Sequence, residues 1–198
     1  MKTSRAVCLL AAVSLSPAAS ARGQDAVMQT ARPLEATAFR IALHPVLLPE
    51  GDDEAGLAGR ADWALNDRLA LQSRFALYND LSFLSAQALY SLTSGGELEL
   101  AALAGVHRSF PDERDAFYGA DLALLASGDR GDSLALFGSL DLDREWPAAP
   151  FAAITRVHLT AGVELALSQR LHALIEVGLG LGDDSPHYVS AGLAWTSE

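Results

Sequence analysis

The sequence of 198 residues has one cysteine, Cys8, and one lysine, Lys2, and both lie in its first ten positions. Only 7% of the residues are aromatic, and the apolar stretch near the N-terminus is too short for a membrane-spanning helix. If the first segment is removed on secretion, no thiol remains, which excludes disulfide bonds, thiol catalysis and cysteine–metal sites. The positive charge of such a mature chain is carried by arginine alone, which is unusual for a water-exposed surface.

Positive charge is scarce overall, because 14 basic residues face 25 acidic ones, giving a formal charge of −11 and a pI of about 4.8. A nucleic-acid partner that needs a basic footprint is therefore excluded. The chain also lacks a nucleotide-binding fingerprint, a metal-ligand cassette and a G-x-S-x-G elbow, so we expect no enzyme activity, no cofactor and no metal site. With 50% hydrophobic residues, the composition is too apolar for disorder and suits one folded domain.

The N-terminal segment has the pattern of a secretory signal peptide. Lys2 and Arg5 form a positive region, residues 6–15 form an apolar region, and Ala19-Ser20-Ala21 fits the small-x-small rule for cleavage before Arg22. Cys8 lies inside the apolar region and is lost on cleavage. The predicted organisation is a signal peptide, a polar leader and one β-barrel domain: residues 1–21, 22–33 and 34–198.

Beyond the leader, apolar and polar residues alternate in runs of roughly nine to twelve, which is the period of a β-strand. The clearest runs are 153–167 and 171–181, where apolar residues occupy every second position. Leucine and alanine favour helices, but neither run has the i, i+3, i+4 rhythm of an amphipathic helix. Three further runs, near 35–44, 81–92 and 116–126, alternate less cleanly. The sequence therefore predicts an all-β fold of about ten strands, with eight as the alternative.

The connections between the runs alternate in length. Compact turns are expected at four places: Asn66-Asp67, 93–96, 127–132 and Ser168-Gln169. Longer loops are expected at four others: 45–55, 107–115, 143–152 and 182–187. The link at Asn79-Asp80 is the exception, because it is short where a long loop is expected. This alternation predicts an up-and-down antiparallel meander with both chain ends on the short-turn side.

Two kinds of protein present such alternating strands. A soluble barrel or sandwich would turn the apolar face inward and bind a small apolar ligand or a partner protein in an interior that holds Leu136, Leu159, Val163, Ile175 and Leu193. A transmembrane barrel would turn that face to lipid and fill a narrow lumen with the polar face. Here the polar face carries isolated charges among Gly, Ala and Ser, which suits a narrow lumen. We therefore favour a single transmembrane β-barrel and keep the soluble protein as the alternative.

Charges inside such a barrel must neutralise one another, because an isolated buried charge is costly. The inward positions carry both signs, and we expect them to form a lumen charge network: Arg40, Arg60, Arg74 and Arg156 with Asp62, Glu99, Asp121, Asp141, Glu164 and Glu176. His158 is expected to be a hydrogen-bonded filler of this network. Acidic residues in two long loops, 50–54 and 183–184, are expected to be solvated rather than to bind a divalent cation.

The final run, from His187 to Trp195, alternates apolar residues with glycine and polar ones and closes on an aromatic. Over residues 34–198, the layout resembles the small outer-membrane β-barrel proteins of Gram-negative bacteria, in the style of OmpA, OmpX and OmpW. The last run looks like the terminal strand that the barrel assembly machinery reads in that family, with Tyr188, Gly192, Leu193 and Trp195 as its marked positions. It departs from the family where residues 196–198 follow Trp195, since an aromatic last residue is usual.

The resemblance implies a porin-like outer-membrane protein without enzyme activity, with a side-chain-filled lumen and a structural or surface-interaction role. Its implied partners are outer-membrane lipid and the barrel assembly machinery. It implies no nucleic acid, cofactor or metal. Five aromatic residues are candidates for the membrane interfaces: Trp63, Tyr78, Tyr90, Tyr118 and Trp195. The soluble alternative would place the chain in the periplasm.

Overall fold

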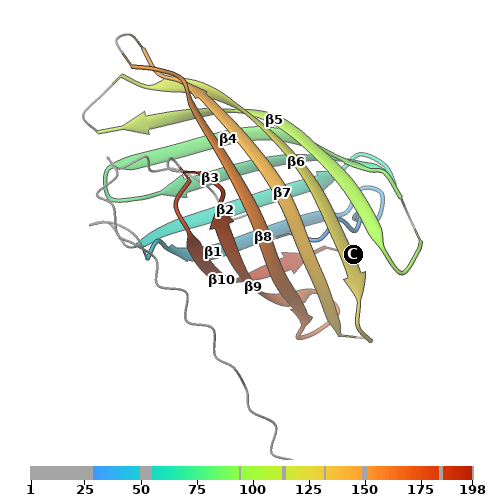
Figure 1. The fold of residues 1–198 in the computed structure, drawn as a ribbon. Helices are drawn as coiled ribbons and strands as arrows, with labels where there is room; N and C mark the ends of the chain where they lie inside the picture. The colour runs from blue at the N-terminus through green and yellow to red at the C-terminus, as the bar shows by residue number, and fades with distance from the viewer. Residues whose placement is uncertain are drawn as a thin grey trace, which may run out of the picture.

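The structure is a computed structural model that describes residues 29–49, 55–93, 95–112, 115–131, 133–148, 151–182 and 185–197. Within these ranges the chain forms ten strands and is all-β (Figure 1). In order they are β1 (Phe39–Leu47), β2 (Ala55–Ala64), β3 (Leu69–Leu77), β4 (Leu81–Ser91), β5 (Glu99–Pro111), β6 (Phe117–Asp129), β7 (Leu134–Trp146), β8 (Ile154–Ala166), β9 (Leu171–Gly180) and β10 (Tyr188–Thr196). The described residues include no helix long and apolar enough to cross a membrane. The prediction of ten strands is confirmed, and the alternative of eight is wrong.

The sheet closes on itself. Each strand pairs antiparallel with its sequence neighbours, and β1 pairs with β10 to complete the barrel. Links of four residues join β2 to β3, β6 to β7 and β8 to β9, and the link from β4 to β5, of seven residues, lies at the same end. Both ends of the barrel domain lie beside them, because the Ser197 amide donates to the Phe39 carbonyl and the Thr196 amide donates to Arg170. The predicted up-and-down meander is therefore confirmed.

The two faces of the strands have opposite polarity. The five residues that the soluble alternative placed in an apolar interior point outward instead, and four of them expose 40–53% of their surface: Leu136, Leu159, Ile175 and Leu193. Charged side chains such as Arg156 and Glu176 are buried inside, at 1% and 0% exposure. An apolar outer belt on a closed sheet, with every strand paired, is the form in which β-structure crosses a membrane. These five residues therefore do not form the apolar interior that the soluble alternative assigned to them.

The strands differ in length, so the barrel is taller on one side. Strands β5 to β8 have 13 residues each, whereas β1, β3 and β10 have nine. About 9–11 residues suffice to cross a bilayer, so the long strands extend past it at the long-loop end. The expected loops 107–115 and 143–152 were placed too early, since β5 continues to Pro111 and β7 to Trp146. β6 likewise continues to Asp129, into the expected turn 127–132, and the first run lies at Phe39–Leu47 rather than 35–44.

Glycines inside the barrel make room for rings from the neighbouring strand. A Cβ atom at Gly162 would overlap the Phe137 ring, and one at Gly178 would overlap the Tyr188 ring. A Cβ at Gly56 would likewise overlap the ring of Tyr78. Tyr78 is therefore a buried lumen residue with 9% exposure, and its predicted place at a membrane interface is wrong.

Aromatic side chains form a belt at each end of the outer surface. At the short-turn end, Trp63 is exposed and Phe39 packs edge-on against Trp195, with ring centroids 6.3 Å apart. At the long-loop end, Tyr118 and Trp146 are adjacent across β6 and β7 and both point outward. Trp and Tyr favour the two membrane–water boundaries, so these belts mark the limits of the hydrocarbon.

Candidate functional site in the barrel lumen

The eleven residues of the predicted charge network occupy inward positions, but they form separate groups along the barrel. The group at the short-turn end is centred on Glu164, which is 8% exposed. Arg40 Nη2 donates to Glu164 Oε2 over 2.9 Å, and His172 Nδ1 lies 2.9 Å from Glu164 Oε1. Both carboxylate oxygens therefore have a partner, which offsets the cost of burying the charge.

The predicted polar leader enters the lumen at this same end. The Ala31 amide donates to Ser127 Oγ over 3.1 Å, and Gln72 Nε2 donates to Gln29 Oε1 over 2.6 Å. Ala31 is fully buried in an apolar layer formed by small and branched side chains from β3 to β6: Ala70, Leu89, Ala101, Leu103, Ala123 and Leu125. Residues 29–31 therefore close part of the lumen. We call residues 29–33 the leader segment.

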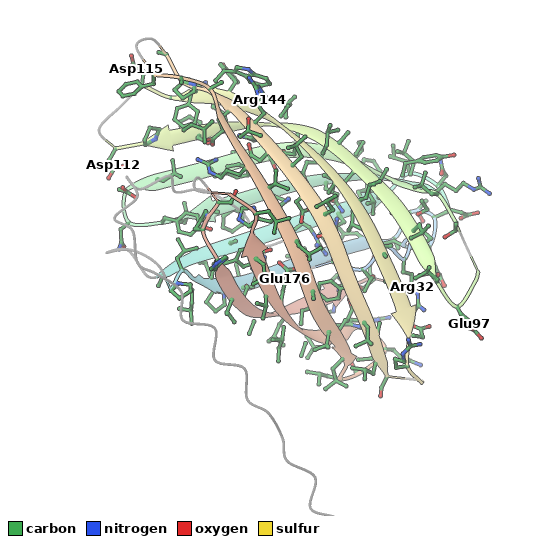
Figure 2. All side chains as sticks on the ribbon, in the orientation of Figure 1. Arg32, Glu97, Asp112, Asp115, Arg144 and Glu176 are labelled. Atoms are coloured by element: carbon green, nitrogen blue, oxygen red, sulfur yellow. The ribbon has the colours of Figure 1, made fainter. Side chains whose placement is uncertain are left out.

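An arginine holds the leader segment in place. Arg32 forms ion pairs with Asp129 at the end of β6 and with Glu99 of β5, the latter at 3.4 Å. Partial burial lowers the pKa of Arg32, but the Asp129 and Glu99 carboxylates outweigh it and raise that pKa above its usual value. Arg32 and Glu97 lie at the opposite end of the barrel from Asp112, Asp115 and Arg144 (Figure 2). Glu99, expected to meet an arginine of the strands, is thus paired with the leader segment.

A cavity of about 240 Å³ lies between the leader segment and the barrel wall. Arg32 and Asp129 line one part of it, and Arg40, Glu164 and His172 line another. Arg32 is paired with Asp129, and Arg40 and His172 are both paired with Glu164.

The middle of the lumen contains shorter links. Arg60 Nε donates to Asp62 Oδ2 on the same strand over 2.8 Å. Gln87 connects Arg74 to Asp121, because its Oε1 accepts from Arg74 at 3.5 Å and its Nε2 donates to Asp121 over 3.0 Å. Asp62 therefore has the expected kind of partner, whereas an amide separates Arg74 from Asp121.

Hydroxyl groups hold two further carboxylates. Tyr188 donates to Glu176 Oε1 over 2.6 Å, and Ser139 donates to Asp141 Oδ2 over 2.7 Å. Ser139 also contacts the hydroxyl of Thr160. These bonds lie on the wall formed by β7 to β10, where hydroxyl groups help to hold buried carboxylates.

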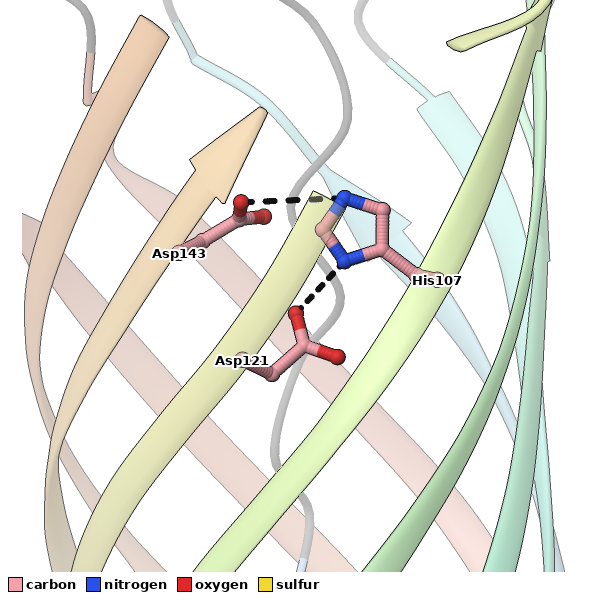
Figure 3. A group of neighbouring side chains, drawn as sticks. All are labelled: His107, Asp121 and Asp143. Atoms are coloured by element: carbon pink, nitrogen blue, oxygen red, sulfur yellow. Dashed lines mark hydrogen bonds and ion pairs between the residues drawn. The ribbon is translucent and has the colours of Figure 1, made fainter. Parts of the chain in front are cut away.

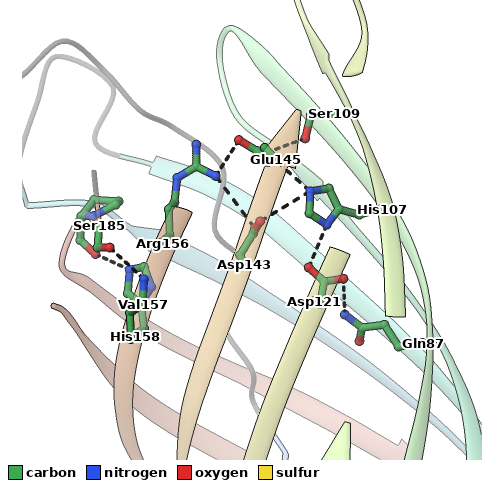
Figure 4. A network of polar contacts seen from close by, with 11 residues as sticks. Gln87, His107, Ser109, Asp121, Asp143, Glu145, Arg156, Val157, His158 and Ser185 are labelled. Carbon is green, nitrogen blue, oxygen red and sulfur yellow. Dashed lines mark hydrogen bonds and ion pairs between the residues drawn. The ribbon is translucent and has the colours of Figure 1, made fainter. Parts of the chain in front are cut away.

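The largest polar group lies toward the long-loop end (Figure 4). His107 Nδ1 lies 2.8 Å from Asp121, and His107 Nε2 lies 3.6 Å from Glu145 and 3.7 Å from Asp143. Arg156 Nη1 lies 2.7 Å from Glu145 and 3.9 Å from Asp143. Ser109 donates to Glu145 as well. Arg156 thus has two carboxylate partners that were not among the predicted network.

His107, Asp121 and Asp143 could offer metal ligands, since one donor atom from each lies within 4.8 Å of the others. Figure 3 shows that the two carboxylates approach opposite nitrogens of the ring. Metal coordination needs donors that converge on one point, with one nitrogen of each histidine as a ligand. A ring protonated on both nitrogens would instead donate toward both carboxylates. The geometry therefore favours a bridging histidine over a metal centre.

His158 and the seam between β1 and β10 use backbone acceptors. His158 Nε2 lies 2.9 Å from the Pro186 carbonyl oxygen, so it contacts a loop rather than the charged groups.

In the seam, the Ser190 hydroxyl donates to the Pro45 carbonyl over 2.7 Å, and its oxygen lies 3.0 Å from His44 Nδ1. Pro45 has no amide hydrogen, so these side chains support the ladder where it lacks a bond.

The marked residues of the last strand divide between its two faces. Tyr188 and Gly192 point inward, and a Cβ at Gly192 would overlap His44 across the seam. Leu193 and Trp195 point outward, with 51% and 42% exposure. Gly192 therefore has a local reason to be glycine, which is the approach of β1 to β10.

Several lumen residues were missed by sequence reasoning. His107 and Asp143 lie on the inward face, yet they were left out of the network, and Ser109 and Glu145 fall in segments expected to be loops. The alternation continues through both segments, with Arg108, Phe110, Arg144 and Trp146 outward, and this continuation was the available signal. The predicted signal peptide and the acidic residues at 50–54 and 183–184 lie outside the described residues.

Comparison with known proteins places the fold. No protein-family model matches the sequence, and no curated protein matches it either. Among solved structures, the KdgM porin has a TM-score of 0.50 at 8% identity, covering 80% of this chain and 99% of the porin. The N-terminal β-barrel domain of Pseudomonas aeruginosa OprF has a TM-score of 0.40 at 15% identity, covering 83% and 100%. A designed transmembrane β-barrel has a TM-score of 0.45 at 14% identity, covering 83% and 99%.

At these identities the likeness is one of fold. The chain has the fold of an outer-membrane β-barrel, as predicted from its layout. The outer membrane is the location that follows from this fold and from the apolar outer surface.

Proposed function

We propose that the protein is a non-enzymatic outer-membrane barrel whose lumen is closed by its own side chains and by the leader segment. The observation that carries this proposal is the series of occupied layers along the axis. The Ala31 layer lies at one end, the Glu176–Tyr188 and Arg60–Asp62 links lie in the middle, and the His107 group lies toward the other end.

A closed lumen suits a structural or surface-interaction role rather than diffusion of solutes. Each buried charge in these layers has a partner of opposite charge or a hydroxyl, so little free energy is gained by admitting water. The long loops at the far end and the outward surfaces remain available for contact with lipid or with other molecules. The barrel assembly machinery is proposed as the partner during insertion, reading β10.

Single-channel recording in planar bilayers tests the closed lumen. The purified barrel is expected to give no steady current, and an open porin of known conductance serves as the positive control. A stable ohmic current through the unmodified protein would contradict the proposal and favour a narrow channel instead. Heat-modifiable mobility on gels first establishes that the inserted protein is folded.

A further inference from the structure

The outer surface carries two arginines whose positions need an explanation. Among the ten strands, four arginines point inward, whereas Arg108 of β5 and Arg144 of β7 point outward. Both lie near the long-loop ends of their strands, which finish at Pro111 and Trp146. A guanidinium on the lipid-facing surface is costly at the bilayer centre but tolerated near the interface, where a long arginine side chain can extend to the headgroups.

Aromatic rings surround these arginines. Arg108 Cζ lies 5.0 Å from the centre of the Phe110 ring and 5.2 Å from that of Tyr118. Arg108, Tyr118 and Trp146 lie in one row across β5, β6 and β7. We call Arg108, Phe110, Tyr118, Arg144 and Trp146 the arginine–aromatic patch.

The positive charge of the patch has no acidic neighbour on the outward face of strands β5 to β8. The outward positions of β5 to β8, in the part of the chain that the structure describes, carry no carboxylate. Arg108 is held by ring faces, which leave its N–H donors free, and Arg144 Nη1 donates to the Thr155 hydroxyl over 3.0 Å. Two arginines therefore lie on the outward face of these strands with no carboxylate beside them on that face, and the exposed Asp112 and Asp115 belong to the link between β5 and β6, beyond the strand ends.

We propose that the arginine–aromatic patch binds the phosphorylated headgroup of an outer-leaflet glycolipid, one that carries two phosphates. Guanidinium groups match phosphate oxygens in charge and in forked geometry. The two arginines lie on strands separated by β6 and are offset by two residues along the strands, so their backbones are about 12 Å apart. Two phosphates on one headgroup can each meet one guanidinium, while the aromatic rings contact the sugar and the upper acyl chain.

Trp146 provides a direct reporter for this binding. A Trp63→Phe/Trp195→Phe chain keeps Trp146 as its single tryptophan and is refolded in phosphatidylcholine vesicles. Lipid A with two phosphates is titrated in, and a saturable change in Trp146 emission is expected. The double variant Arg108→Gln/Arg144→Gln is expected to bind about tenfold or more weakly, since basic residues near a membrane surface each contribute to anion attraction. Lipid phosphate retained per purified barrel gives a second readout that does not depend on fluorescence.

The matched control is Arg68→Gln/Arg170→Gln, which removes the same charge from the short-turn end and is expected to bind like the parent. Gel mobility shows whether each variant folds. If the double variant does not fold, the two single variants replace it, each with an expected loss of about threefold. Equal binding by the parent and the Arg108/Arg144 variants would overturn the proposal. So would an equally strong response to phosphatidylglycerol or to dephosphorylated lipid A.

Discussion

At the residue scale, the lumen depends on partners that satisfy buried carboxylates. Tyr188→Phe keeps the ring against Gly178 but removes the hydroxyl that donates to Glu176. A buried group that loses a hydrogen bond costs about 1–3 kcal/mol, so the free energy of unfolding is expected to fall by that amount. Urea titration in lipid vesicles measures the change. Tyr90→Phe is the matched control because Tyr90 points outward, and an equal loss in both variants would count against the lumen bond.

At the outward positions, the free-energy cost of a charged substitution depends on the depth of the residue in the bilayer. Ile175 is near the middle of β9 and is 53% exposed, whereas Leu179 lies next to the last residue of that strand. Arginine at the bilayer midplane costs about 2–4 kcal/mol and much less near an interface. Ile175→Arg is therefore expected to lower the unfolding free energy by about that amount, and Leu179→Arg by less. Folding titrations that show the reverse order would contradict the assigned depth.

Individual residues also show how much of the structure could be predicted from the sequence. Alternation assigns each residue to a face, so Arg40 and Glu164 could both be placed inside the barrel. Their contact could not be predicted, because these residues lie 124 positions apart and meet only through the closure and stagger of the sheet. Leu103 and Leu125 also point inward, since leucine fills the apolar layer around Ala31. Polarity alone gives no signal for such positions.

At the scale of the strand, glycine and ring positions act as matched pairs. Gly162→Ala places a methyl group against the Phe137 ring, and overpacking of this kind costs about 1–3 kcal/mol. We expect the variant to unfold at lower urea and the double variant Gly162→Ala/Phe137→Leu to recover part of the loss. Gly96→Ala is the control, because its nearest neighbour is the Leu98 carbonyl at 3.5 Å. A loss that the Phe137 substitution does not reduce would argue against steric pairing.

Strand ends were the least predictable feature of the elements. Within the hydrocarbon, lipid selects apolar residues at every second position, and the resulting pattern is plain in β8 and β9. At its boundary, water and headgroups permit Arg108 and Arg144 on the same face, so the hydropathy signal fades while the ladder continues. The His107 group and the arginine–aromatic patch both lie in this region, which is why neither was identified from composition.

At the scale of the whole molecule, side chains block the lumen at several levels along its axis. One of these levels is blocked by the leader segment, which is not part of the sheet. The leader segment is held by the burial of Ala31 and by the ion pairs of Arg32, whose side chain is 53% exposed. Exposed pairs contribute little, about 1 kcal/mol or less, so the burial of Ala31 and the buried hydrogen bonds of Ala31 and Gln29 carry most of the attachment. A charge at that position should therefore release the segment while the ten strands stay paired.

Thiol labelling tests this release. In a chain with Cys8 replaced by serine, Ala101→Cys places a single thiol in the apolar layer beside Ala31. A water-soluble maleimide is expected to react slowly with it, and Ala31→Glu is expected to speed labelling about tenfold, since a carboxylate cannot stay in that layer. Ala36→Glu, at an exposed position, should leave the rate unchanged. Because the middle and long-loop layers remain in place, Ala31→Glu should still pass no steady current. Fast labelling in the parent would show that the leader segment does not close the lumen.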